Sequence, residues 1–287
     1  MTLSEFRENY PTSTLTLSTG KPFTYRYARN PEARATLVLL TGGIGLSDLF
    51  YLHFIRFSRD FSVLTFDYQL PFGDNREFAE AVAELLHHLG EKVWLVGQSL
   101  GGIVAQIIAA EHPEVVDGLV LSNTCSLSAG MNESAMNHVS GMIRGTRKSK
   151  CLLRLIPFGL YKRLVKRVVM TKKTGSFTQE EKDLMESLCD AMLEQLTKPY
   201  ELHMLDFLMD AQHHMGMTPD QFIPWDDRVL LILSEDDDTF NADAKEALVE
   251  IMPHPTVVTK LTGGHLALLI RLDAYADLVT DYIRKRT

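Results

Sequence analysis

Short apolar runs alternate along much of this chain with stretches in which apolar residues recur at helical spacing. Runs of β-branched residues and leucine predict strands that are buried on both faces. One helix is clearly marked, since Asp74 caps it, Glu77 follows three residues later and Gly90 closes it. The expected strands cover residues 35–40, 61–66, 93–96 and 115–122, a further helix covers 47–57, and an antiparallel hairpin at 12–18 and 23–29 precedes them. This alternation predicts a parallel sheet with helices on both faces.

The alternation stops after Asn123 and resumes after Pro224. Between these points the pattern is helical, with helices expected over 152–170, broken near Pro157 and Gly159, and over 179–196 and 201–214. After the interval we expect a strand at 228–234, a helix at 242–252, a strand at 256–261 and a final helix at 266–286. The prediction is a doubly wound α/β core of residues 1–125 and 224–287, interrupted by a helical insertion of residues 126–223.

The stretch Gly97-Gln98-Ser99-Leu100-Gly101 lies at the predicted junction of a strand and a helix. The two glycines flank Ser99 where a side chain would collide with neighbouring backbone in a sharp turn. Such a strand–turn–helix holds a serine hydroxyl out above the edge of the sheet, the arrangement known as a nucleophile elbow. A flexible turn without chemistry is the alternative reading. Candidate partners for Ser99 elsewhere in the chain distinguish these two interpretations.

A serine nucleophile needs a base within hydrogen-bond reach and a third group to orient that base. Of the ten histidines, His265 follows Gly263-Gly264 directly after a predicted strand, at the carboxyl edge of the sheet. An acidic run, residues 235–238, follows the preceding strand at the same edge. Most of its carboxylates are expected in solvent, because four adjacent charges cannot all be buried. One of them is a candidate to turn inward toward His265.

The chain order of Ser99, an acid near residue 237 and His265, with G-x-S-x-G at an elbow, resembles the α/β-hydrolase superfamily, in particular capped esterase-like and proline iminopeptidase-like members. The resemblance covers nearly the whole chain and implies a mostly parallel eight-stranded sheet with a helical cap after the sixth strand. It also implies a Ser99–Asp237–His265 triad, because Ser234-Glu235-Asp236-Asp237 matches the family's G-x-x-D with serine in the glycine position.

The resemblance further implies an oxyanion hole built from the backbone N–H groups of Leu100 and Gly43. The loop that carries Gly43 begins with Thr41-Gly42 where the family usually has His-Gly, which leaves the anchoring of this loop open. Gln98 replaces a histidine often found there, and we expect no chemical role for it.

Composition narrows the function classes. The chain has 287 residues, 45% of them hydrophobic, and a net charge of −8, which argues against general nucleic-acid binding. The start of the chain has neither a basic segment nor an apolar core, so we expect a cytoplasmic protein. Three widely spaced cysteines, Cys125, Cys151 and Cys189, suggest neither disulfides nor a metal site, and His213-His214 lack a third metal ligand at recognisable spacing. No cofactor is expected.

One segment departs from the acidic average. Residues 144–173 contain 11 Lys or Arg and no acid, and apolar residues lie between the charges. A solvated helical face is the favoured interpretation, and a surface for an anionic substrate or an anionic membrane is the sharper one. The insertion is also rich in Met, Leu and Phe, which either pack the cap on the core or face an apolar substrate.

A serine hydrolase that cleaves an ester-type bond of a small, largely apolar substrate is therefore the expectation, with no prediction of oligomeric state. Thioesterases, peptidases, carbon–carbon hydrolases and cofactor-free haloperoxidase-like members share the fold and triad. The alternative outside the enzymes is a non-catalytic receptor that binds a small apolar ligand in the same cavity.

Overall fold

The computed structural model describes residues 1–172 and 177–287. Its centre is a single sheet of eight strands in the order β1-β2-β4-β3-β5-β6-β7-β8. Neighbours are parallel from β4 onward, whereas β1 pairs with β2 and β2 pairs with β4 in antiparallel fashion. The strands are β1 (Ser13–Thr16), β2 (Pro22–Ala28), β3 (Thr36–Leu40), β4 (Ser62–Thr65), β5 (Val93–Gln98), β6 (Val116–Ser122), β7 (Val229–Ile232) and β8 (Thr256–Val258). The predicted mostly parallel, eight-stranded sheet is confirmed.

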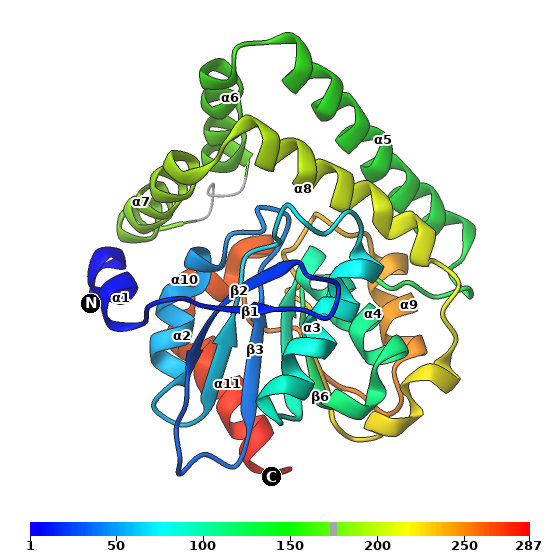
Figure 1. Cartoon of the computed structure of the whole chain (residues 1–287). Helices are drawn as coiled ribbons and strands as arrows, with labels where there is room; N and C mark the ends of the chain where they lie inside the picture. The colour runs from blue at the N-terminus through cyan, green and yellow to red at the C-terminus, as the bar shows by residue number, and fades with distance from the viewer. Residues whose placement is uncertain (173–176) are drawn as a thin grey trace.

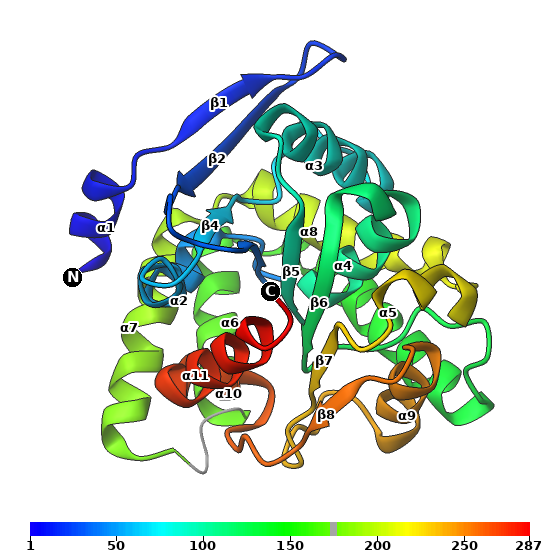
Figure 2. The ribbon, with the colours of Figure 1, turned by 90° about the horizontal axis from the view of Figure 1, so that it is seen from below.

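Helices cover both faces of this sheet (Figure 2). Alternate residues of β3 point to opposite sides, so that Val38 and Leu40 pack into one hydrophobic cluster and Leu37 and Leu39 into another. The first cluster lies under α3 (Asn75–Leu89), α4 (Leu100–Glu111) and α9 (Ala242–Ile251), and the second under α2 (Tyr51–Phe57) and α11 (Leu272–Arg284). Burial on both faces explains why the central strands read as continuous apolar runs.

Four helices follow β6 and stand over the carboxyl edge of the sheet; we call them the cap (Figure 1). They are α5 (Glu133–Leu155), α6 (Phe158–Lys172), α7 (Gln179–Gln195) and α8 (Lys198–Asp210). The predicted start of the first helix at residue 152 was wrong, because α5 begins 19 residues earlier, capped by the Asn132 side chain on the Ala135 N–H. Glycines 141 and 145 lower the helix propensity of this segment. The packing of α5 against α8 and α9 stabilises the helix instead.

The two ends of the chain also differ from expectation. A short helix, α1 (Leu3–Asn9), begins at a capping box between Thr2 and Glu5, and its Phe6 is fully buried. The expected final helix is split into α10 (Ala267–Ile270) and α11, with Arg271 outside helical geometry between them. None of the helices in the described part of the chain is long and apolar enough to cross a bilayer.

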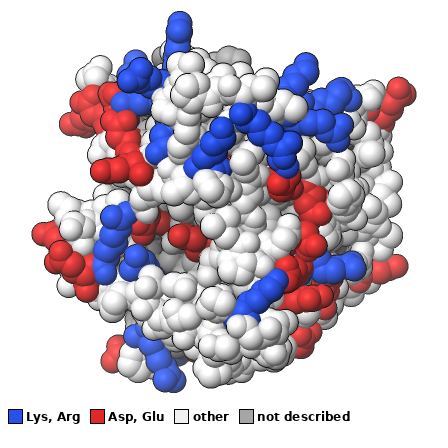
Figure 3. Space-filling model, turned by 45° about the horizontal axis from the view of Figure 1, so that its top comes forward, with Lys and Arg blue, Asp and Glu red and all other residues white. Residues whose placement is uncertain are grey.

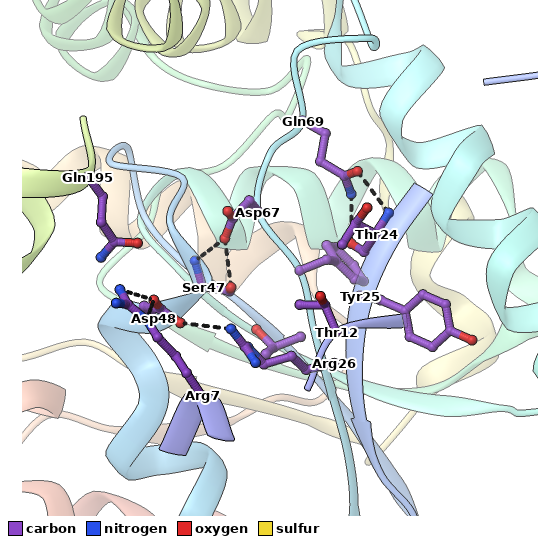
Figure 4. Close-up of a pocket in the computed structure, with 12 residues that line it drawn as sticks. Arg7, Thr12, Thr24, Tyr25, Arg26, Ser47, Asp48, Asp67, Gln69 and Gln195 are labelled. Atoms are coloured by element: carbon purple, nitrogen blue, oxygen red, sulfur yellow. Dashed lines mark hydrogen bonds and ion pairs between the residues drawn. The ribbon is translucent and has the colours of Figure 1, made fainter. Parts of the chain in front are cut away.

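A polar cavity of about 190 Å³ lies where α1 meets β2 and the segment after β3 (Figure 4). Asp48 lies between two arginines, 2.6 Å from Arg7 and 3.7 Å from Arg26. Asp67 accepts hydrogen bonds from both the backbone N–H and the hydroxyl of Ser47, and burial raises its pKa. The ion pair between Arg7 and Asp48 anchors α1 to the core, and the Asp67 carboxyl is satisfied by Ser47. The predicted site residues lie elsewhere.

Candidate active site

Ser99 occupies the sharp bend between β5 and α4. Its φ of 53° and ψ of −119° are values that residues other than glycine rarely adopt. A Cβ atom on Gly97 would lie 2.3 Å from the carbonyl oxygen of Gly101, and one on Gly101 would lie 2.1 Å from that of Leu40. Both positions therefore require glycine, as the sequence pattern predicts. Hydrogen bonds from the Ser99 N–H to Ser122 and from the Thr124 hydroxyl to the Ser99 carbonyl hold the bend.

His265 lies in a 3₁₀ turn, Gly264–Leu266, that follows β8, and its Nδ1 is 3.0 Å from Oδ2 of Asp237. The Asp237 side chain is fully buried and that of His265 is 14% exposed. Burial by itself raises the pKa of the Asp237 carboxyl. Hydrogen bonds from His265 and Thr239, together with the charge of His265, outweigh burial and hold that pKa below its ordinary value. Asp237 is therefore an ionised partner for the imidazole.

The neighbouring acids have other partners. Asp236 accepts a hydrogen bond of 2.8 Å from the N–H of Gly263, and Glu235 accepts one from the hydroxyl of Thr259. Asp236 thus fastens the loop that carries His265 rather than contacting the ring. Among the three aspartates that the sequence left open, the structure brings Asp237 to the histidine.

Gln98 contacts His265 from the other side. Its amide nitrogen lies 3.2 Å from His265 Nε2 and donates to the His265 carbonyl oxygen at 3.2 Å. Within the described residues, Ser99 Oγ makes no hydrogen bond to His265, although both residues line the same cavity. The sequence reasoning gave Gln98 no role. The sequence signal for Gln98 was a polar side chain at the last position of a strand that is otherwise apolar and buried throughout.

Gly43 lies on the loop after β3, beside Ser99 in the cavity lining, and Leu100 is the first residue of α4, where helix N–H groups have no partner within the helix. Two tyrosines anchor this loop in place of the expected histidine. The Tyr68 hydroxyl donates to the Thr41 carbonyl, and the Tyr200 hydroxyl of α8 donates to the Gly45 carbonyl, each at 2.7 Å. The cap is thus bonded directly to the loop that carries Gly43.

Two apolar cavities meet at Ser99. The larger, about 290 Å³, extends between the Gly43 loop, the His265 turn and cap helices α6 and α7, and Val165, Met185 and Leu188 are among its lining. The smaller, about 60 Å³, lies between α4, α5 and α8 and shares only Ser99 with the lining of the larger one; its lining includes Leu100, Ile143 and Met215. The insertion therefore contributes apolar residues to both cavities, whereas Phe207 and Leu205 are buried in packing.

Cys125 lines the smaller cavity but is not a competing nucleophile, because burial raises the pKa of its thiol to about 12. In residues 1–172 and 177–287 there is no group of three His, Cys, Asp or Glu side chains placed to hold a metal ion. His213 and His214 both meet Asp210, at 3.0 and 3.1 Å. Asp210 also accepts from the Asn75 side chain and backbone, which joins the cap to α3.

A family model described as the alpha/beta hydrolase family matches residues 37–278. The chain belongs to the α/β-hydrolase family. A curated relative named "Putative carbamate hydrolase RutD", from Agrobacterium fabrum, is 32% identical over 106 residues. That match covers 33% of this α/β-hydrolase chain and 41% of the relative, less than half of either.

Two solved structures have the same architecture across their whole length. A thermophilic esterase from Thermogutta terrifontis has a TM-score of 0.71 at 17% identity and covers 96% of this chain and 98% of its own. An enol-lactonase from Burkholderia xenovorans LB400 has a TM-score of 0.70 at 16% identity and covers 95% and 100%. At such identities the likeness shows the α/β-hydrolase fold alone.

Proposed function

We propose that this α/β-hydrolase is a serine hydrolase that cleaves carboxylic esters of apolar groups through an acyl-enzyme. Ser99 attacks the carbonyl carbon, His265 Nε2 takes its proton, and Asp237 orients and stabilises the imidazole. The N–H groups of Leu100 and Gly43 donate hydrogen bonds to the oxyanion, and water then hydrolyses the acyl-enzyme to release the acid. The observation that carries the proposal is Ser99 at a strained elbow, in one cavity with a histidine that is held by a buried carboxylate.

We assign the two arms of the proposed substrate to the two cavities. His265 must protonate the leaving-group oxygen, so the leaving group lies on the His265 side, in the cavity of about 290 Å³. The acyl group then enters the cavity of about 60 Å³, which admits only a short chain. The proposed substrate is a short-chain acyl ester of a larger apolar alcohol. The linings of the two cavities favour apolar groups on both arms of the substrate, because burial of apolar surface supplies the binding free energy.

The names of the similar proteins agree with attack on an acyl carbon, since they describe a carbamate hydrolase, an esterase and an enol-lactonase. A carbamate, an ester and a lactone each present a carbonyl bonded to a leaving heteroatom. Thioesters and amides share that feature, so a panel of matched oxyester, thioester, carbamate and anilide substrates ranks these alternatives. A preference for the oxyester supports the proposal.

The test of the proposal is turnover of p-nitrophenyl acetate and butyrate, together with labelling by a fluorophosphonate. We expect wild-type turnover and covalent labelling at Ser99, and loss of both in Ser99→Ala. Full esterase activity in Ser99→Ala, or a wild-type protein that resists the label, contradicts the proposal.

One observation favours a second candidate, a non-catalytic receptor for a small apolar ligand. The Gln98 amide is hydrogen-bonded to His265 Nε2, the ring nitrogen that must be free to accept the Ser99 proton if His265 is the base. A receptor binds an apolar ester without turning it over, so measurement of both binding and turnover with the same ester separates the two functions.

A further inference from the structure

Large apolar side chains of α5 and α6 are exposed on the outside of the cap. Leu155, at the end of α5, is 82% exposed, and Val168 on α6 is 52% exposed. On α6 the exposed apolar residues recur every four positions, so they lie on one face of the helix. We call this surface the apolar stripe; it consists of Leu152, Leu155, Leu160, Leu164 and Val168. Large apolar side chains exposed together on one helix face and at the end of the preceding helix indicate an interaction surface.

Cations lie beside the stripe. Arg154, Arg163 and Arg167 are exposed, and within residues 1–172 and 177–287 they have no ion pair. Two lysines of the same segment are instead paired with acids of other cap helices, Lys150 with Asp206 and Lys166 with Glu186 and Asp190. Lys and Arg side chains gather over the upper part of Figure 3 with uncharged surface between them, and acidic side chains lie beside them at the left. Lys173, counted in the basic segment of the sequence, lies outside the described residues.

The apolar stripe adjoins the larger cavity. Val168 belongs to the stripe and also lines that cavity, together with Val165 and Val169 from the inner side of the same helix. Figure 1 shows α5 and α6 meeting at the edge of the cap, away from the sheet. A surface that contacts the stripe therefore also approaches, at Val168, the cavity that contains Ser99.

We propose that the α5–α6 face of the cap docks on an anionic lipid surface. Leucines alternating with arginines fit such a surface, because the apolar side chains enter the boundary of the acyl chains while the cations remain among the headgroups. A solvated helical face explains the charges but leaves five large apolar side chains in water. A second copy of this chain fits poorly, because a symmetric contact between two stripes brings arginines against arginines. The docking goes beyond the proposed hydrolysis and does not depend on it.

The experiment is vesicle flotation with full-length Ser99→Ala protein, so that lipid hydrolysis does not alter the vesicles. Phosphatidylcholine vesicles are compared with vesicles that also contain phosphatidylglycerol. We expect binding to the anionic vesicles alone, and weaker binding as salt rises, because ions screen the attraction. The charge variant Arg163→Glu with Arg167→Glu should lower the partition coefficient by about tenfold or more. The apolar variant Leu160→Ser with Leu164→Ser should lower it comparably, since two inserted side chains are lost.

Matched controls change the same residue types elsewhere on the surface. Ile223→Ser with Val257→Thr removes exposed apolar side chains outside the stripe, and Lys92→Glu with Lys285→Glu reverses exposed charges on the core. Both controls should bind like the parent, and thermal unfolding checks that every variant folds. Equal losses in stripe and control variants, or no binding of the parent to anionic vesicles, overturn the proposal. It is also overturned if sedimentation shows a dimer that the leucine variant abolishes while vesicle binding persists.

Discussion

The side-chain amide of Gln98 meets His265 at two atoms, the ring nitrogen Nε2 and the main-chain carbonyl, each at 3.2 Å. A carbonyl oxygen can only accept, so the amide nitrogen faces the histidine and donates to both atoms. Nε2 is then the unprotonated nitrogen, and Nδ1 carries the hydrogen that is donated to Asp237. Gln98 therefore favours the tautomer that the proposed mechanism needs. Its hydrogen bond to the lone pair of Nε2 must break before that lone pair can accept the Ser99 proton.

The role of Gln98 is tested by exchanging its donor for an acceptor. Gln98→Glu places a carboxylate at Nε2 and favours a proton on the atom that has to accept the Ser99 proton. We expect kcat/KM at neutral pH to fall at least about 100-fold, the lower range of what a general base contributes. Gln98→Met fills the same space without hydrogen bonds and should stay within about thirtyfold of wild type, since two hydrogen bonds of about 1 kcal/mol each are lost. Equal effects of the two substitutions would show that Gln98 only fills space.

Asp237 and Asp236 provide a matched pair in one loop. Asp237→Asn preserves shape, but its remaining oxygen is held by the Thr239 N–H, so the amide nitrogen faces Nδ1 and favours the wrong tautomer of His265. We expect kcat to fall by about 10⁴. Asp236→Asn keeps an oxygen for the Gly263 N–H and should lower kcat by less than about tenfold. Steady-state kinetics on one p-nitrophenyl ester compare the two, and a reversed order would move the triad acid to Asp236.

The elbow shows what a sequence can predict about this site. Gly97 is required by a contact within the elbow, with the Gly101 carbonyl, and Gly101 is required by the Leu40 carbonyl of the adjacent strand β3. The pattern of two glycines around Ser99 reflects both contacts, so it predicts the elbow from the sequence. The strands were predicted correctly for a related reason, because burial on both faces makes the central positions of β3, β5 and β6 continuous apolar runs, with polar residues only near the strand ends.

Contacts between distant segments could not be read in this way. Tyr200 bonds to Gly45 across 155 positions, and Gln98 reaches His265 across 167. The residues next to Tyr200 and Gln98 in the sequence do not indicate these distant partners. The start of α5 was missed because packing on α8 and α9, not local propensity, stabilises residues 133–151. The assignment of cap boundaries at residues 126 and 223 stays a prediction.

The bond from Tyr200 to Gly45 connects the cap to the loop that carries Gly43. Tyr200→Phe removes that hydrogen bond and leaves the ring in place. We expect kcat to fall by about tenfold with little change in KM, because a looser loop weakens oxyanion binding more than ground-state binding. Tyr161→Phe is the control, since it removes a tyrosine hydrogen bond to Glu201 within the cap. A loss of kcat in the control as large as in Tyr200→Phe would assign the effect to cap stability.

His53 makes the folded state sensitive to acid. Burial lowers its pKa to about 4, and its Nε2 contacts the Leu268 carbonyl at 3.0 Å. The unfolded chain binds a proton on this residue near its ordinary pKa of 6.5, so stability is full above that pH and is lost as pH falls toward 4. We expect His53 to lower the free energy of unfolding by about 2 kcal/mol between pH 7 and pH 5.

Urea unfolding at the two pH values measures this loss, with His53→Gln as the reference, because glutamine keeps a donor for Leu268 and has no charge to gain. The lowered pKa of Asp237 acts in the same direction but below its ordinary value of 3.8, outside this interval. An equal pH dependence in wild type and His53→Gln would show that His53 is not the sensitive group.

The assignment of acyl and alcohol arms predicts opposite effects of two cavity substitutions. Ile143→Ala enlarges the smaller cavity, so esters with longer acyl chains should gain about fourfold in kcat/KM per added methylene that finds space, at constant alcohol. Val169→Phe fills part of the larger cavity and should lower kcat/KM for bulky alcohols while the acyl preference is unchanged. A two-dimensional panel of acyl lengths and alcohol sizes measures both. If Ile143→Ala instead changes the alcohol preference, the alcohol lies in the smaller cavity and the acyl group in the larger one. That result would contradict the assignment, because His265, which must protonate the alcohol oxygen, lines the larger cavity.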